Sequence, residues 1–138
     1  MARYRRAFVD GGTFFFTVVT RRRARWLCSS LARQIFSACM REAKEAWPFH
    51  VDAIVLLPDH LHAIWSLPPG DNAYSKRWAW IKLEFSKRWI AAGGSERPVS
   101  AARKRRGDRG VWQPRFWEHT IEDETDFERH FDYVHYNP

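Results

Sequence analysis

The sequence predicts an α+β fold in which helices pack against one antiparallel sheet. Runs of aromatic and β-branched residues, which are typical of strands, alternate with longer segments whose apolar residues recur every three or four positions, as in helices. The predicted elements follow the order β, α, β, β, α, β, α, and no internal repeat is present. The chain has 138 residues, so we expect residues 1–138 to form a single domain.

The first strand and the first helix are predicted in the N-terminal third of the chain. The segment "TFFFTVVT" (13–20) is aromatic or β-branched almost throughout, which indicates a strand buried on both faces. Residues 27–46 are expected to form an amphipathic helix, and Pro48 lies just beyond its end. The apolar stripe of this helix is predicted to contain Cys28, Leu31, Ile35, Cys39 and Ala43. Both cysteines are therefore expected to be buried thiols.

A hairpin and a second long helix follow. The segments "FHVDAIVLL" (49–57) and "HLHAIWSL" (60–67) read as two strands joined by a Pro-Asp turn. After a Pro-Pro-Gly-Asp break, residues 72–92 are predicted to be helical. The apolar face of this helix is expected to contain Trp78, Ile81, Phe85 and Trp89.

The C-terminal third completes the predicted fold. Residues 93–110 form a polar, basic segment that we expect to be a mobile loop. The segment "VWQPRFWEHTI" (111–121) reads as an edge or bulged strand, because Pro114 cannot donate a ladder hydrogen bond. Residues 123–137 begin with acidic side chains, as helix N-termini do. This order is a split βαβ, ferredoxin-like arrangement with helices on one face of the sheet, plus a C-terminal helix.

Composition points to an anionic partner. The formal net charge is +7 and the pI is about 9.9, which favours nucleic acid as the partner, although a solvated basic surface is an alternative. The sequence contains eight tryptophans, more than a small core needs, so some rings are expected to face a ligand. No segment approaches the roughly 20 apolar residues of a membrane span, and the N-terminus lacks the apolar run of a signal peptide. We therefore expect a cytoplasmic protein with no membrane partner.

The hairpin contains two histidines separated by one residue. In a strand, His60 and His62 lie on the same face, roughly 6.5–7 Å apart along the chain, while Leu61 points into the core. Two neutral imidazoles at this spacing can bind one divalent cation if a third ligand comes from elsewhere. The alternative is a pair of half-exposed polar residues on an alternating strand, and the spacing alone leaves both readings open.

The C-terminal helix offers further polar groups. At 100° per residue, its apolar stripe faces the sheet and places Tyr133 and Asn137 together on one flank, one turn apart, whereas Tyr136 points to solvent. An ordinary partly buried tyrosine followed by a helix stop at Asn137 is the alternative. His119 and His130 are additional imidazoles, for which structural roles are favoured over ligand or proton-transfer roles.

Taken together, these motifs resemble the HUH single-strand DNA transposases. The histidine pair on a strand and the "YxxxN" of the late helix are similar to that superfamily, and "WQPRFWEH" with "DYVHYNP" resembles its REP-associated tyrosine transposases, of the IS200-like type. The resemblance implies that Tyr133 is the nucleophile and forms a 5′-phosphotyrosine with single-stranded or hairpin DNA. It also implies that His60, His62 and Asn137 hold Mg²⁺ or Mn²⁺, in a protein that is a monomer or a homodimer.

Basic and aromatic residues are the candidates for contact with DNA. On the helix at 72–92, Lys76, Trp80 and Lys87 lie opposite the apolar stripe, an arrangement suited to phosphates and a stacked base. A further protein layer over Trp80 is the alternative. Two arginine-rich clusters are expected to grip the backbone of a hairpin. They contain Arg21, Arg22, Arg23 and Arg25, and Arg103, Lys104, Arg105 and Arg106.

Three functions remain compatible with these patterns. The first is a metal-dependent tyrosine nuclease and strand transferase acting on hairpin-forming DNA. The second is a protein derived from a transposase that binds DNA hairpins without cutting them, and the third is an RNA-binding split-βαβ domain. The presence together of His60, His62, Tyr133 and Asn137 favours the enzyme, because a binding protein has no need of all four.

Overall fold

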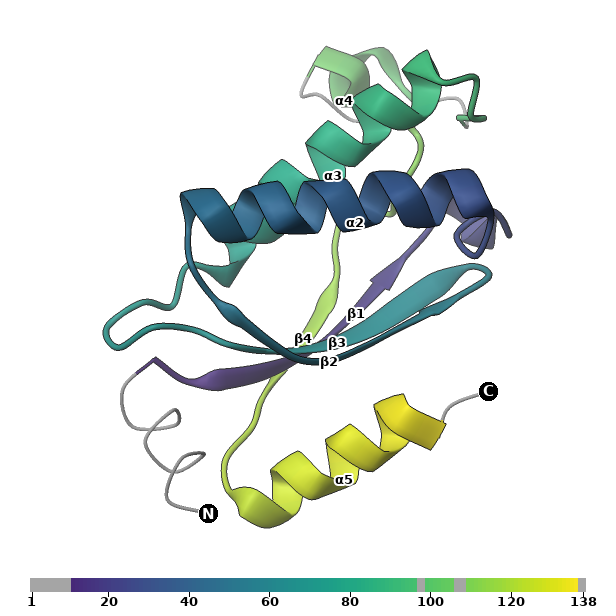
Figure 1. The fold of residues 1–138 in the computed structure, drawn as a ribbon. Helices are drawn as coiled ribbons and strands as arrows, with labels where there is room; N and C mark the ends of the chain where they lie inside the picture. Colours follow the sequence, from purple (N-terminus) through teal and green to yellow (C-terminus); the bar gives the residue numbers. More distant parts are fainter. Residues whose placement is uncertain (1–10, 97–98, 106–108, 137–138) are drawn as a thin grey trace.

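The computed structural model describes residues 11–96, 99–105 and 109–136. A four-stranded antiparallel sheet has the order β2-β3-β1-β4 and contains β1 (Thr13–Val19), β2 (His50–Leu57), β3 (His60–Ser66) and β4 (Trp117–Thr120). The helices α2 (Ser30–Ala46) and α3 (Tyr74–Ala91) cover one face of the sheet, and α5 (Glu124–Tyr136) lies on the other (Figure 1). The predicted α+β fold, with its order of elements along the chain and its C-terminal helix, is confirmed. The side on which α5 lies is new information, because the prediction placed only the other helices.

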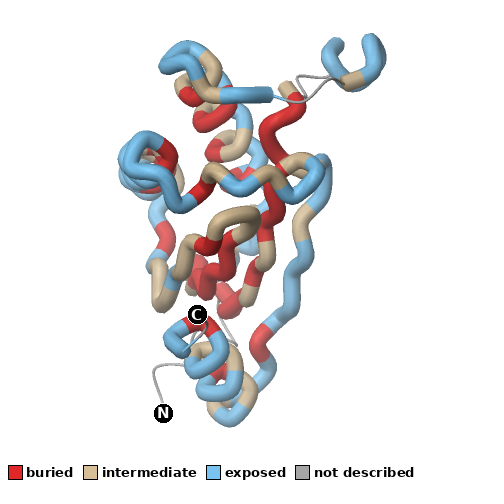
Figure 2. The backbone as a smooth tube through the Cα atoms, turned by 90° about the vertical axis from the view of Figure 1, so that its right-hand side faces the viewer, coloured by how far each residue is buried: buried red, intermediate tan, exposed pale blue. Residues whose placement is uncertain are grey.

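Both faces of the sheet are apolar, and alternation along β1 explains how. Phe14, Phe16 and Val18 join the larger core beneath α2 and α3, together with the aromatic residues of α3. Phe15 points the other way, into a smaller cluster with Ile64 of β3 and the apolar residues of α5. Buried positions accordingly gather along the strands, and exposed ones along the outer sides of the helices (Figure 2). The expectation that residues 13–20 form a strand buried on both faces is confirmed in this way.

The apolar face of α2 differs from the predicted stripe. The helix begins at Ser30, and the Ser29 side chain accepts a hydrogen bond from the Ala32 backbone N–H as its N-cap. Cys28 therefore precedes the helix and is exposed, with its thiol directed at the Leu56 carbonyl oxygen at 3.3 Å. Leu31 is also exposed. The buried residues of α2 are Ala32, Phe36, Cys39, Met40 and Ala43, so the stripe is rotated towards the larger side chains.

Two other elements depart from expectation in the region between α3 and α5. A short helix, α4 (Ala101–Arg105), lies within the segment predicted to be a loop. The last strand is also shorter than expected, because only Trp117–Thr120 pair with β1. Before Pro114, the chain makes a single bridge between Trp112 and Thr20. Among the described residues, no helix combines the length and apolar character needed to cross a membrane.

Candidate active site

The histidine pair lies on the sheet face covered by α5. His60 and His62 project from β3 on this face, while Leu61 is fully buried in the core on the other. The two imidazole rings are 4.9 Å apart between centroids and nearly perpendicular, at 78°. The predicted side-by-side placement of the rings is therefore confirmed. His62 is more buried than a half-exposed strand position would be, with 4% of its surface accessible.

Each imidazole is held through its Nδ1 atom. The Nδ1–H of His60 donates to Oδ1 of Asp59 at 2.7 Å, since a carboxylate can only accept. Nδ1 of His62 lies 2.9 Å from the Thr17 hydroxyl oxygen. Nε2 of His62 is buried and, among the described residues, has no hydrogen-bond partner. Imidazoles that ligate metals are oriented in this way by the second nitrogen, so this pair fits a divalent cation.

The charges around the pair also suit a cation. Burial, followed by the neighbouring His60, lowers the pKa of His62 to about 4, so its imidazole is neutral at pH 7, as a ligand must be. Burial works to raise the pKa of Asp59, but hydrogen bonds from His60 and Arg23 outweigh it and lower that pKa. The site therefore combines a neutral imidazole with a nearby carboxylate that remains ionised.

Tyr133 lies beside this pair. Its ring centroid is 5.0 Å from that of His62 and 6.1 Å from that of Phe15. Tyr133 is nevertheless accessible to solvent, with 53% of its surface exposed. Tyr136 is 75% exposed and contacts the His135 ring. The helical-face assignment, with Tyr133 towards the histidines and Tyr136 towards solvent, is confirmed by these positions.

The N-terminus of α5 fixes where Tyr133 falls. The Asp123 carboxylate accepts a hydrogen bond from the Asp126 backbone N–H at 2.8 Å, and its carbonyl oxygen accepts one from Phe127. Phe127 and Val134 are buried against the sheet. With both ends of the apolar stripe anchored, Tyr133 must lie on the flank nearest β3. Asn137, the third predicted ligand, lies outside the described residues.

The first arginine cluster follows β1 and divides into two parts. The Arg23 guanidinium pairs with Asp59 at 2.9 Å, and it therefore connects to His60 through that carboxylate. Arg21 and Arg22 instead line a hollow of about 470 Å³ that Arg103 of α4 also borders. The structure thus brings the two predicted basic clusters together. Arg25, Lys104 and Arg105 are exposed, and Arg106 lies outside the described residues.

The basic and aromatic residues of α3 lie on the opposite face of the sheet from Tyr133 (Figure 1). The Lys76 ammonium is 4.9 Å from the Trp47 ring centroid, and Trp80 packs edge-on against the same ring. Lys87 pairs with Glu84 at 3.5 Å. The structure does not bring these residues together with the histidine pair, and their contact with DNA stays a prediction.

Trp117 is an aromatic residue on the histidine face that the sequence analysis did not single out. Trp117 is the β4 partner of Thr17 in β1, the residue that contacts His62. Its surface is 64% exposed. The other tryptophans are buried or half-buried, and several stack on one another, as Trp65 and Trp78 do at 4.3 Å. The alternation Trp117, Glu118, His119 in β4 was the available signal for its position.

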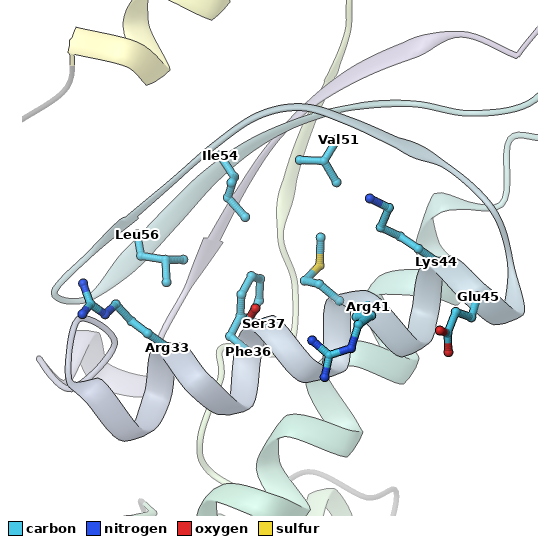
Figure 3. Close-up of a pocket in the computed structure, with 10 residues that line it drawn as sticks. Arg33, Phe36, Ser37, Arg41, Lys44, Glu45, Val51, Ile54 and Leu56 are labelled. Atoms are coloured by element: carbon cyan, nitrogen blue, oxygen red, sulfur yellow. The ribbon is translucent and has the colours of Figure 1, made fainter.

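A second hollow, of about 600 Å³, lies between α2 and the edge strand β2 (Figure 3). Its floor is apolar, with Ile54 and Leu56 of β2 and Phe36 of α2. Arg33, Arg41 and Lys44 stand around it. It opens on the face that carries α2, away from Tyr133, and it contains none of the predicted catalytic residues.

Comparison with known proteins gives consistent matches. The family model described as "Transposase IS200 like" matches residues 9–137. A REP-associated tyrosine transposase of Escherichia coli (strain K12) is 37% identical over 138 residues, which are 100% of this chain and 73% of that protein. A putative REP-associated tyrosine transposase of Haemophilus influenzae is 36% identical over 138 residues, covering 100% of this chain and 76% of that protein.

Solved structures agree with the sequence matches. A REP-associated tyrosine transposase bound to a REP hairpin has a TM-score of 0.74 and 38% identity, over 94% of this chain and 68% of that one. A putative transposase from Deinococcus radiodurans has a TM-score of 0.58 and 14% identity, over 85% and 84% of the two chains, and is similar in fold. The chain therefore belongs to the IS200-like transposases, as a relative of the REP-associated tyrosine transposases.

Proposed function

We propose that this transposase is a metal-dependent tyrosine nuclease and strand transferase that acts on hairpin-forming single-stranded DNA. One observation carries the proposal: the Tyr133 ring lies 5.0 Å from that of His62, on the sheet face where both predicted imidazole ligands project. A nucleophile and a cation site side by side are what phosphodiester transfer requires.

In the proposed reaction, Tyr133 acts as the nucleophile. Its phenolic oxygen attacks a DNA phosphorus, forms the phosphotyrosine ester and loses its proton. The bond from phosphorus to the 3′ oxygen breaks, and the leaving oxygen takes up a proton to give a free 3′-OH. The covalent intermediate keeps one phosphodiester-type bond, so the 3′-OH of the same or another strand can reverse the step. The half-exposed position of Tyr133 leaves room for the strand.

His60 and His62 would hold the cation, with Asn137 proposed as the third ligand. The buried Nε2 of His62, which lacks a hydrogen-bond partner among the described residues, is the atom that best fits this role. When bound, Mg²⁺ or Mn²⁺ would offset the negative charge that develops on the phosphate oxygens. Nitrogen ligands suit Mn²⁺ better than Mg²⁺.

The DNA substrate is proposed from the relatives and from charge. One similar structure is described as bound to a REP hairpin, and this chain has a formal net charge of +7. Arg21, Arg22 and Arg103 line one hollow, which suits the backbone of a hairpin because phosphate contacts position a duplex without reading its sequence.

A covalent-adduct assay tests the proposal. The full chain is incubated with a single-stranded, REP-type hairpin oligonucleotide and Mn²⁺, and the products are separated on a denaturing gel. We expect a protein–DNA adduct that Tyr133→Phe abolishes while hairpin binding persists, because only the nucleophilic oxygen is removed. Tyr136→Phe is the matched control and should retain the adduct.

Three results would contradict parts of this account. An adduct that survives Tyr133→Phe, or disappears in Tyr136→Phe, would assign the nucleophile to another residue. Cleavage that continues unchanged in EDTA would remove the metal from the mechanism. Tight hairpin binding by the native chain with no adduct under any metal would instead favour the alternative, a binding protein that does not cleave.

A further inference from the structure

A second group of metal-ligating side chains lies outside the histidine pair of β3. His119 comes from β4, and Asp126 and His130 come from α5. One ligand atom of each residue lies within 4.8 Å of the others. Nε2 of His119 is 2.9 Å from Oδ2 of Asp126, and Nδ1 of His130 is 3.1 Å from Oδ1 of the same carboxylate.

Backbone geometry brings the three residues together. His119 lies opposite Phe15 in the β1–β4 register, so its side chain points to the face that α5 covers. Asp126 and His130 are four residues apart and share one side of the helix. The two imidazole rings stack at 4.6 Å and 20°. Nε2 of His119 hydrogen-bonds to the Asp126 carboxylate, whereas Nδ1 of His130 lies 2.9 Å from the Asp126 backbone carbonyl oxygen and also close to the carboxylate.

We propose that His119, Asp126 and His130 form a binding site for Zn²⁺ or a similar late first-row divalent metal. Two imidazole nitrogens and one carboxylate oxygen are typical ligands of such ions, whereas Mg²⁺ and Ca²⁺ prefer oxygen alone. Tetrahedral zinc at about 2.0–2.1 Å from each ligand needs ligand atoms roughly 3.3 Å apart. The spacings of 2.9 and 3.1 Å from the two imidazole nitrogens to the Asp126 carboxylate are close to this value, and all three ligand atoms lie within 4.8 Å of one another.

The carboxylate at the centre is held in place and ionised. Oδ2 of Asp126 also accepts a hydrogen bond from the Glu122 backbone N–H at 3.0 Å. Burial acts to raise the pKa of Asp126, but this backbone hydrogen bond and the two histidines outweigh it and lower the pKa. Binding of a metal would replace the hydrogen bond between His119 and the Asp126 carboxylate, and the one between Nδ1 of His130 and the Asp126 backbone carbonyl oxygen. His119, the most exposed of the three, gives the ion a path from solvent.

This site is separate from the candidate active site. The Phe15 ring lies between them, with its centroid 5.4 Å from that of His62 and 4.8 Å from that of His130. The metal would join β4 to α5 at one turn before Tyr133. Its role would therefore be to fix the helix that carries the proposed nucleophile, a function beyond the proposed strand-transfer chemistry.

Calorimetric titration with Zn²⁺ alone tests the inference without DNA or cleavage. The full chain is first stripped with EDTA and dialysed. The test begins from the His60→Ala/His62→Ala double variant, which removes the other cation site. We expect this variant to bind one equivalent of Zn²⁺, and the further change His119→Gln to weaken that binding at least tenfold. Glutamine can still hydrogen-bond Asp126, so a merely structural role for His119 would be preserved.

The controls separate a metal site from a general effect on the fold. His135→Ala in the same double variant removes an exposed histidine from the same helix and should leave the Zn²⁺ equivalent unchanged. Far-UV circular dichroism verifies that each variant is folded. The inference is overturned if the double variant binds no Zn²⁺, or if His119→Gln leaves both stoichiometry and affinity as they were.

Discussion

Thr17 and His62 face each other directly across the β1–β3 ladder, and the threonine hydroxyl oxygen lies 2.9 Å from the Nδ1 atom of the imidazole. This contact fixes the ring of a residue that is almost fully buried. It also leaves Nε2 as the atom directed towards a ligand. Thr17 is thus a positioning residue for the proposed cation site.

We expect Thr17→Val to lower the affinity for Mn²⁺ roughly tenfold, the lower end of the usual effect of losing a residue that orients a metal ligand. Valine keeps the shape and removes only the hydroxyl. Thr17→Ser should retain most of the affinity. The matched control is Thr13→Val, the same change at a buried position of the same strand, which contacts Ser66 instead. Equal Mn²⁺ affinities for Thr17→Val and the native chain would contradict the assignment.

Asp59 is expected to matter more, because it holds His60 and is itself held by Arg23. We expect Asp59→Ala to lower Mn²⁺ affinity by about 10–100-fold, the usual cost of removing a carboxylate that orients a metal-binding imidazole. Asp59→Asn should lose less, since the amide oxygen can still accept from Nδ1–H. Calorimetry without DNA measures both. If the two variants lose the same affinity, the carboxylate acts on the fold and not through the imidazole.

The hollow bordered by Arg21 and Arg22 predicts a salt-dependent effect on DNA binding. Each lost phosphate contact on a duplex reduces the log–log salt slope by about 0.9, so Arg21→Gln/Arg22→Gln should flatten it by about 1.8. All hairpin sequences should weaken alike. Arg41→Gln/Lys44→Gln removes the same charge at the other hollow and should change the slope less. A loss confined to one hairpin would make these arginines sequence readers.

Trp117 is expected to stack on a base of the single strand, since it is exposed on the face that carries Tyr133. Stacking on an aromatic ring contributes about 1–3 kcal/mol per base. Trp117→Ala should therefore weaken binding of single-stranded DNA by roughly 5- to 150-fold, and Trp117→Phe should retain most of it. Fluorescence anisotropy measures both. A greater loss for Trp80→Ala would instead place the strand along α3.

The pairing of the buried Arg77 with the partly exposed Asp71 predicts a pH dependence of stability. Both carboxylate oxygens accept from the guanidinium, at 2.7 and 3.1 Å, and this pairing lowers the pKa of Asp71 to about 2. A lowered folded-state pKa contributes stability that is complete above the unfolded value near 3.9 and is lost as pH falls through about 2.

Asp71→Asn should therefore lower the free energy of unfolding at pH 7 by about 2 kcal/mol, because the buried Arg77 guanidinium keeps only backbone carbonyl oxygens as strong partners. The difference from the native chain should shrink between pH 4 and 2 in urea titrations. Glu128→Gln, at an exposed position of α5, is the control. A difference that stays constant with pH would mean that the amide disrupts the turn and not the ion pair.

The regular repeats of strands and helices made it possible to predict from the sequence which way the histidines of β3 and the tyrosines of α5 point. Side chains alternate in a strand, so His60 and His62 had to share a side, and a step of 100° per residue separates Tyr133 from Tyr136. The stripe of α2 was less determined, because two overlapping sets of apolar residues run along that helix. The bulk of Phe36 and Met40, packed against the sheet, decides between them.

Contacts between separate elements could not be read from the sequence in the same way. The grouping of His119 with Asp126 and His130 depends on where β4 pairs with β1 and on which face α5 covers. Trp117 faces the histidines for the same reason. Pro114 indicated irregularity in this region, but it did not give the residue at which β4 begins.

The apolar clusters on the two faces of the sheet differ in size, and this difference affects how readily each face opens locally. Tyr133 is carried by α5, which is held by the smaller cluster of Ile64, Ile121, Phe127 and Val134, whereas α2 and α3 share the larger core. Amides of α5 should therefore exchange with deuterium at a lower opening free energy than those of β1. The helix that would bond to DNA is thus expected to open locally more readily than the strands beneath it.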